Sequence, residues 1–237
     1  MGPSGARLPI AAYGRMHEIY KFAMAHPGQV CYTVPMITLG DGRSFPMKKS
    51  ELTVQIMLGG PSKRMGTDKA LVTLGGKTLL DRAVETWKDY AAGLQLSVGA
   101  PERKALAPAG TLAVADIYPD RGPLAGLHAG LRACTSRWML LVGVNFPFLT
   151  PAQADTLVDA IGDADACVYT IDGVPQPLFG VYRKRCMSFA ETMMLNGDYD
   201  IRNLLDWANT VYIPLEDTAP FRSVDTPADL EEAQHLV

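Results

Sequence analysis

The sequence has no excess of positive charge, no long apolar run and no regular spacing of cysteines or histidines. Its formal net charge is −3, so the chain offers no overall positive field to nucleic acid or to an anionic membrane. The longest apolar run, residues 138–144, is far shorter than the roughly 20 residues that span a bilayer, and the first twenty residues lack the pattern of a secretory signal. These absences favour a cytoplasmic enzyme or binding protein.

The cysteines and histidines are too scattered to suggest a metal centre. No cysteine lies within four positions of another, which does not fit zinc-knuckle spacing, and no two histidines share a helical i, i+4 face. The cysteines are Cys31, Cys134, Cys167 and Cys186. We expect buried, reduced thiols rather than metal ligands or disulfides.

The composition of the chain changes near residue 52. The first fifty residues contain eleven glycines and prolines, with six basic and two acidic side chains, whereas the rest is acidic overall. A chain of 237 residues provides one large domain or two small ones. We expect residues 1–52 to be an N-terminal extension of unknown role and residues 53–237 to form the main domain.

From residue 53 onwards, short apolar runs alternate with helical patterns. Strands are predicted over 53–58, 94–98, 112–115, 138–142, 166–170, 178–182 and 211–214, and helices over 79–87, 101–106, 124–131, 151–161, 184–195, 201–208 and from 226. This alternation predicts an α/β fold of three layers, a mostly parallel sheet with helices on both faces. Ligands of such sheets bind beyond the carboxyl ends of the strands, here after residues 58, 115 and 142.

A glycine pair and several cations follow the first predicted strand, in a segment that reads MLGGPSKRMGTDKA over residues 57–70. Gly59 and Gly60 let the backbone approach a ligand and aim its N–H groups at phosphate oxygens. The cations, which can offset the charge of a nucleoside triphosphate, are Lys63, Arg64 and Lys69. The spacing fits neither a Walker loop nor a G-x-G-x-x-G turn, so by itself it also fits an ordinary solvated loop.

This segment resembles the L-A-G-G-x-S-x-R-M-G-x-D-K-A signature of the MobA-like nucleotidyltransferases, the molybdenum cofactor guanylyltransferases, with Leu58 in place of the family's alanine. Three further blocks are similar to family segments in the same order: ADIYPDRGPLAGLHAGL (115–131), QPLFGVY (176–182) and FRSVDTPADL (221–230). The blocks extend over about three quarters of the chain. The resemblance implies a Rossmann-like nucleotidyltransferase fold.

The resemblance also implies a reaction, the transfer of GMP from GTP to the phosphate of molybdopterin with release of pyrophosphate and Mg²⁺ as cofactor. Molybdoenzymes or other cofactor-assembly proteins are implied partners. The residues carried over are Arg64 and Lys69 for catalysis; Met57, Leu58, Gly59, Gly60, Lys69, Asp116 and Asn145 for nucleotide binding; Asn145 for the metal; and Ser223 and Asp225 for the pterin side. Asp68 is expected to form a turn or to orient Arg64.

One block departs from the family pattern. The family has C-D-M-P-F, whose aspartate binds Mg²⁺, whereas residues 144–148 read VNFPF. Asn145 offers a carbonyl oxygen without a charge, so we expect metal affinity to fall roughly ten- to hundredfold, the effect of one charge-assisted contact. Ser223 and Asp225 also stand where the family has asparagines.

Two alternatives to an active guanylyltransferase therefore stay open. One is a catalytically weak relative that binds nucleotide or cofactor as an accessory protein, which Asn145 and Leu58 favour. The other is a related transferase that uses CTP, or one that acts on a sugar phosphate or cobinamide phosphate.

Overall fold

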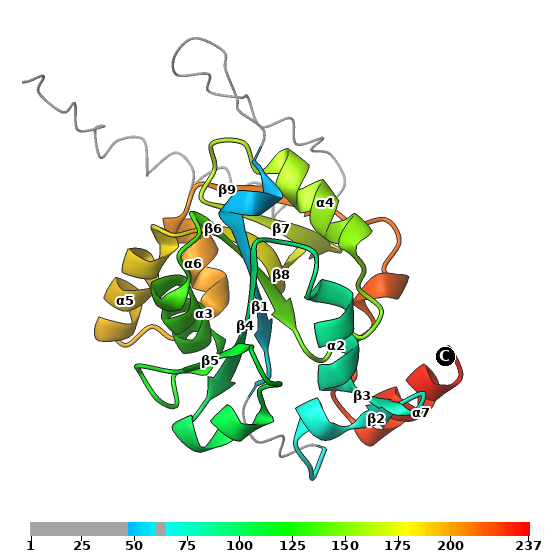
Figure 1. Cartoon of the computed structure of the whole chain (residues 1–237). Coiled ribbons are helices and arrows are strands. Elements are labelled where there is room, and N and C mark those ends of the chain that lie inside the picture. The colour runs from blue at the N-terminus through cyan, green and yellow to red at the C-terminus, as the bar shows by residue number, and fades with distance from the viewer. Residues whose placement is uncertain (1–46, 60–64) are drawn as a thin grey trace, which may run out of the picture. The chain divides into compact units, whose positions relative to one another are not determined.

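A mostly parallel sheet of seven strands forms the centre of the computed structural model, which describes residues 47–59 and 65–237 (Figure 1). The strand order is β5-β4-β1-β6-β8-β7-β9. Only β8 runs against its neighbours, β6 and β7, while the other pairs are parallel. The strands are β1 (Leu52–Met57), β4 (Gly93–Gly99), β5 (Leu112–Ala115), β6 (Trp138–Gly143), β7 (Ala166–Ile171), β8 (Val174–Arg183) and β9 (Thr210–Pro214).

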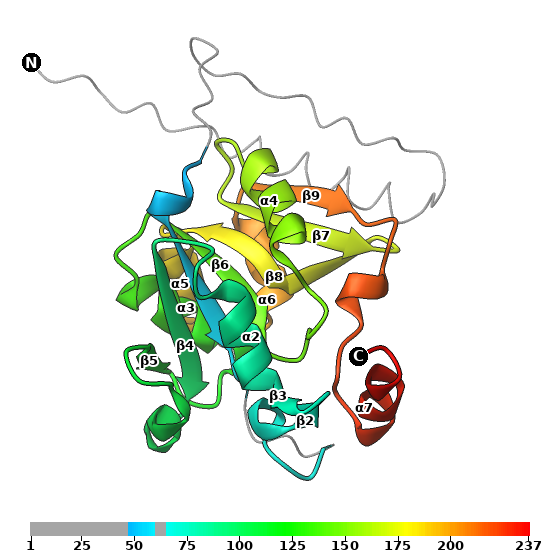
Figure 2. The ribbon, with the colours of Figure 1, turned by 45° about the vertical axis from the view of Figure 1, so that its right-hand side comes forward.

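Helices cover both faces of this sheet, as predicted (Figures 1 and 2). One face packs against α2 (Leu79–Trp87) and α4 (Pro151–Ala160), and the other against α3 (Gly122–Ala133), α5 (Cys186–Leu195) and α6 (Ile201–Trp207). The last helix, α7 (Pro227–Gln234), lies beside a small hairpin of β2 (Thr73–Leu74) and β3 (Lys77–Thr78). Short 3₁₀ helices are η1 (Lys49–Glu51), η2 (Lys69–Leu71), η3 (Pro101–Leu106) and η4 (Ala219–Phe221).

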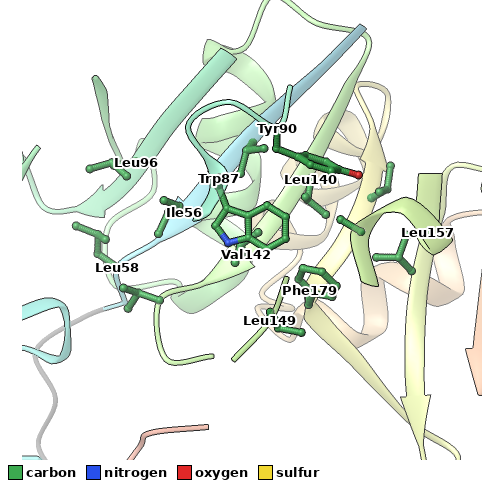
Figure 3. Packing of buried hydrophobic residues seen from close by; sticks show 14 of the residues in the cluster. Ile56, Leu58, Trp87, Tyr90, Leu96, Leu140, Val142, Leu149, Leu157 and Phe179 are labelled. Atoms are coloured by element: carbon green, nitrogen blue, oxygen red, sulfur yellow. The ribbon is translucent and has the colours of Figure 1, made fainter. Parts of the chain in front are cut away.

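The central strand β1 is buried along its whole length because both of its faces are covered. Val54 and Ile56 belong to the core beneath α2 and α4, whereas Met57 belongs to the core beneath α3, α5 and α6. In the first core, Trp87 of α2 packs near Phe179 of β8 with ring centroids 5.9 Å apart (Figure 3). A mostly apolar run in the sequence thus indicates a strand that is buried on both faces of the sheet.

Buried glutamines hold α3 close to the sheet. The side-chain amide of Gln55 donates to the carbonyl of Gly126 at 2.9 Å, and that of Gln95 donates to Gln55 Oε1 at 2.7 Å and to the carbonyl of Gly130 at 3.0 Å. A Cβ at residue 130 would lie 1.8 Å from Gln55 Oε1, so only glycine permits this approach. The bonds satisfy the buried amides and fix the position of α3, whose first turn lies near the end of β5.

The sequence predicted the main strands and helices but missed the start of β8 and the β2–β3 hairpin. β8 begins at Val174, four positions before the predicted strand, and forms a hairpin with β7. Asp172 and Gly173, with φ of 49° and 78°, form its turn, and an Asp-Gly pair with two positive φ angles suits a tight hairpin. Pro175 and Pro177 obscured the strand in the sequence, since proline disfavours strand interiors.

No helix in residues 47–59 and 65–237 combines the length and apolar character needed to span a membrane.

Candidate active site

Four neighbouring parallel strands, β5, β4, β1 and β6, end at one edge of the sheet. The residues that follow them include Asp116 after β5, Gly59 after β1 and Asn145 after β6. Neighbouring strands lie about 4.8 Å apart, so the ends of β5 and β6 are separated by roughly 14 Å. These three predicted residues therefore share one edge, with Asp116 and Asn145 on either side of the loop that follows β1.

The loop after β1 begins with a buried leucine and an exposed glycine. The Leu58 side chain is fully buried and packs in the core with Ile56 and Leu96 (Figure 3), and its N–H donates to Ser97 O at 3.0 Å. The added bulk of leucine relative to alanine thus lies in the core rather than at the surface of the edge. Gly59 is exposed and has φ of +70°, a conformation that favours glycine.

Three of the predicted residues of this loop, Gly60, Lys63 and Arg64, lie outside the described residues. The described chain resumes at Met65 and reaches η2 through Asp68.

Asp68 anchors the returning end of this loop, and its partner is Arg103 of η3. Asp68 Oδ1 accepts from the N–H of Ala70 at 3.1 Å and caps η2, while Oδ2 accepts from Arg103 Nη2 at 2.7 Å and Nε at 3.2 Å. Arg103 Nη1 also donates to the carbonyls of Gly59 and Val98. Arg103 therefore ties the ends of β1 and β4 to the start of η2.

The sequence did not identify Arg103. The expectation that Asp68 forms a turn agrees with its capping of η2, and among the described residues Asp68 pairs with Arg103. The alternative that Asp68 orients Arg64 concerns a residue outside the described part of the chain. The one signal available was position, because η3 follows directly after the carboxyl end of β4.

On the other side of β1, Lys69, Asn145 and Asp225 come together from three parts of the chain. Lys69 forms an ion pair with Asp225. Asn145 Nδ2 lies 3.3 and 3.4 Å from the two carboxylate oxygens of Asp225. The side chains of Lys69 and Asp225 are 18% and 26% exposed, so this cluster is accessible but largely shielded from solvent.

Backbone bonds fix the position of Asp225. The N–H of Val224 donates to Asn145 O at 2.8 Å, which joins the segment before α7 to the end of β6. Asp229 Oδ2 accepts from the N–H groups of Asp225 and Thr226, at 2.9 and 2.8 Å, and these bonds lower the pKa of Asp229. Ser223 lies in the same segment and is partly buried.

Asp116 lies at the end of β5, and its N–H donates to Gly99 O at 2.7 Å. Its Oδ1 is buried and has no hydrogen-bond partner among the described residues, and it lies 3.7 Å from where a Cβ on Gly126 would be. Burial, with a smaller effect of the nearby Asp120, raises the pKa of Asp116 to about 6. A buried carboxylate oxygen without a donor suits a hydroxyl or amino group supplied by a ligand.

The oxygen atoms beside Lys69 suit a hard divalent cation. Asp225 offers a carboxylate, to which Asn145 Nδ2 donates, and Mg²⁺ prefers oxygen ligands with water and phosphate completing its shell. Within the part of the chain that the structure describes, no three His, Cys, Asp or Glu side chains gather to hold a metal by themselves. A cation here would therefore depend on a bound nucleotide for further ligands.

Comparison with known proteins gives one consistent result. The model of the MobA-like NTP transferase domain matches residues 54–211. A probable molybdenum cofactor guanylyltransferase of Deinococcus radiodurans is 33% identical over 190 residues, which cover 76% of this chain and 93% of that protein. A molybdenum cofactor guanylyltransferase of Sinorhizobium fredii is 31% identical over 195 residues, covering 76% and 88%.

Among solved structures, the molybdopterin-guanine dinucleotide biosynthesis protein A of Archaeoglobus fulgidus has a TM-score of 0.69 at 25% identity, covering 78% of this chain and 97% of that one. These matches confirm the resemblance that the four sequence blocks indicated.

Proposed function

Since the chain belongs to the family of MobA-like NTP transferase domains, we propose that it transfers GMP from GTP to the phosphate of molybdopterin, releasing pyrophosphate and forming the guanine dinucleotide cofactor. The observation that carries the proposal is the cluster of Lys69, Asn145 and Asp225 at the carboxyl edge of the sheet, beside the loop after β1. The names of the relatives supply the choice of GTP and molybdopterin.

The reaction requires positioning and charge neutralisation rather than a strong base. A phosphate oxygen of molybdopterin bonds to the α-phosphorus of GTP, the bond to the bridging oxygen breaks, and pyrophosphate leaves with that electron pair. Because the attacking phosphate is already an anion, no base has to remove a proton from it. Cations and N–H groups placed where charge develops supply the rate enhancement.

In this proposal, the backbone of Met57, Leu58 and Gly59 holds the nucleotide and Lys69 neutralises its phosphates. The exposed, positive-φ Gly59 supports a close backbone approach. Asp116 accepts a hydrogen bond from the nucleotide, a role supported by its unpaired buried oxygen. Gly60 and Arg64 keep their proposed roles in binding and catalysis from the resemblance alone.

In this proposal, the amide oxygen of Asn145 would hold a magnesium ion beside the carboxylate of Asp225. When bound, the ion would offset the charge that develops on the departing pyrophosphate. The resemblance assigns Ser223 and Asp225 to the pterin side, and the segment that carries them lies directly beside Asn145. The phosphate of molybdopterin would then enter from the α7 side of the edge.

The test is pyrophosphate release by the purified full chain. With GTP, Mg²⁺ and molybdopterin all present, we expect pyrophosphate and one guanine dinucleotide per turnover, with no product when any one of the three is left out. Replacing GTP by CTP or ATP is the selectivity control. Turnover with CTP and none with GTP would make the chain a cytidylyltransferase and overturn the proposal.

Asn145 is the observation that favours a second candidate, an accessory protein that binds nucleotide or cofactor with little catalysis. If the Asn145→Asp variant transfers GMP and the natural chain does not, the natural chain is an accessory protein rather than an active guanylyltransferase. GMP transfer by the natural chain rules out the accessory function.

A further inference from the structure

Two arginines lie over one tryptophan at the edge of the sheet opposite the candidate active site. Trp138 begins β6, so it lies at the amino ends of the parallel strands, and it pairs in register with Arg183, the last residue of the antiparallel strand β8. The guanidinium carbons of Arg183 and Arg137 lie 4.5 and 5.8 Å from the centroid of the Trp138 ring. Since β6 is six residues long, this group lies roughly 17 Å from the carboxyl end of the strand.

Arg183 lacks the acceptor that the other half-buried arginines have. Among the described residues, three arginines are half-buried, Arg82, Arg103 and Arg183. Arg82 donates to the carbonyl of Leu74 at 2.8 Å, and Arg103 donates to Asp68 at 2.7 Å. The Nε atom of Arg183 is buried without a hydrogen-bond partner, and no described residue forms an ion pair with its guanidinium group. A buried donor without an acceptor is uncommon in native proteins and is a usual sign of a bound water or ion.

The nearby carboxylates do not neutralise the positive charge around Trp138. Asp165 is buried and already forms an ion pair with Arg185, and Asp163, the other carboxylate near Arg183, is exposed. Burial, together with the charges of Arg137 and Arg185, lowers the pKa of Arg183. An anion between the guanidinium groups would offset both the burial and the repulsion.

We propose that Arg137 and Arg183 form an anion-binding site for a phosphate group, separate from the candidate active site. Guanidinium groups present their N–H donors in a planar fork that matches the oxygens of phosphate, and the indole ring holds both groups by cation–π contact. Two guanidinium groups without carboxylate partners match the double charge of phosphate better than the single charge of a carboxylate. In addition, α5 begins at Cys186, three residues after Arg183, and its amino end adds partial positive charge.

The test uses the full chain labelled with 5-fluorotryptophan, whose fluorine resonances report Trp87, Trp138 and Trp207 separately. Trp138→Phe and Trp207→Phe assign the three signals. Inorganic phosphate is titrated at constant ionic strength, with chloride as the compensating anion. We expect a saturable shift of the Trp138 signal and little change at Trp87, which is buried in the core beneath α2.

The source of the phosphate group is distinguished by a second titration, with O-phosphoserine in place of inorganic phosphate. Tighter binding of phosphoserine would identify a site for a phosphate ester, and tighter binding of inorganic phosphate a site for the free ion. Either result supports the inference, because both ligands present the same group to the two arginines.

Two variants test the residues themselves. Arg183→Gln and Arg137→Gln each remove one charge, and each should weaken phosphate binding about tenfold or more, the effect of one charge-assisted contact. Arg137 is exposed, so its variant keeps the test valid even if Arg183→Gln disturbs the fold. Lys88→Gln, which removes an exposed cation directly after α2, is the matched control and should leave phosphate binding unchanged.

The outcomes bear on this site alone. A Trp138 shift that chloride produces equally well, or phosphate binding that survives both arginine substitutions in folded protein, overturns the inference. GMP transfer should be the same in Arg137→Gln as in the natural chain, so the proposed function stands or falls independently of this site.

Discussion

Asp68 and Lys69 are neighbours in the sequence, and each forms a largely shielded ion pair at the same edge of the sheet, yet the two pairs differ in what surrounds them. Arg103 beside Asp68 also donates to two backbone carbonyls, and Asp68 also caps η2. Lys69 instead meets a carboxylate that contacts the amide of Asn145. The exposures are nearly equal, 15% and 24% for Arg103 and Asp68 against 18% and 26% for Lys69 and Asp225.

The difference teaches that burial alone does not distinguish an ion pair that anchors the backbone from one that is proposed to act in catalysis. The Asp68–Arg103 pair, which we call the β4-side clamp, uses its remaining hydrogen-bonding capacity on the backbone and so fixes the ends of β1 and β4. The Lys69–Asn145–Asp225 cluster joins side chains from three elements. Its groups are of the kinds that phosphate and metal bind.

Replacing Lys69 should give the largest effect. Lys69→Ala removes the cation proposed to neutralise the phosphates, and we expect the rate of GMP transfer to fall about hundredfold or more, as for loss of a transition-state donor. Pyrophosphate release measures this effect. Lys77→Ala, which breaks the exposed ion pair with Glu85, should leave the rate unchanged. A folded Lys69→Ala variant within threefold of the natural rate would contradict the functional assignment of the cluster.

Breaking the β4-side clamp should have a smaller and mixed effect. Arg103→Ala removes hydrogen bonds to a carboxylate and to two carbonyls, so we expect the free energy of unfolding to fall by about 1.5–3 kcal/mol. GTP should bind about tenfold more weakly because the loop after β1 loses its anchor. Urea unfolding and calorimetry measure the two effects, with Lys104→Ala as the exposed neighbour control. Weaker folding with unchanged GTP binding would limit the clamp to a structural role.

The pH dependence of stability tests Asp116 on the β4 side. Its pKa of about 6 exceeds the ordinary value of 3.8, so the folded chain keeps this proton to higher pH than the unfolded chain does. The free energy of unfolding should therefore fall as pH rises from about 4 to about 6 and stay lowered above that. Asp116→Asn removes the free-energy cost of ionising this buried carboxyl group. The variant should be more stable near pH 7.5 by about 1 kcal/mol, with little change near pH 4.

Urea unfolding at both pH values measures the effect, and Asp206→Asn on α6 provides the exposed carboxylate control. Equal stability of Asp116→Asn and the natural chain near pH 7.5 would show that Asp116 ionises without penalty in the fold.

The smallest effect is expected from removing the N-terminal segment. Both sides of the candidate site are built from residue 57 onwards, and residues 1–52 are predicted to be an extension. Deleting residues 1–46 should leave the affinity for GTP, measured by calorimetry, within about twofold of that of the full chain. A truncated chain that folds but no longer binds GTP would show that the segment contributes to the site.

The sequence predicted the architecture well because burial on two sides leaves a local signal. β1 and β6 are both buried along their whole length, beneath helices on both faces of the sheet. Their apolar composition is therefore enough to predict that they are strands. The first four residues of β8, and with them its hairpin with β7, were missed because two prolines lie there, although Asp172-Gly173 marked the turn.

The sequence named residues of the candidate site but not the contacts between them. Lys69, Asn145 and Asp225 were each identified, yet 156 residues separate Lys69 from Asp225 and 80 separate Asn145 from it. Arg103 was missed because nothing in the spacing of residues 68 and 103 links them.

The sequence by itself therefore determined which strands form the sheet and at which edge chemistry is expected, since both follow from local apolar patterns and from the direction of parallel strands. The tertiary structure alone decided that Asp225 stands against Asn145 and Lys69, and that Arg103 holds Asp68. Such contacts depend on how distant segments pack, because a side chain's neighbours are set by the sheet order and by the path of the chain before α7.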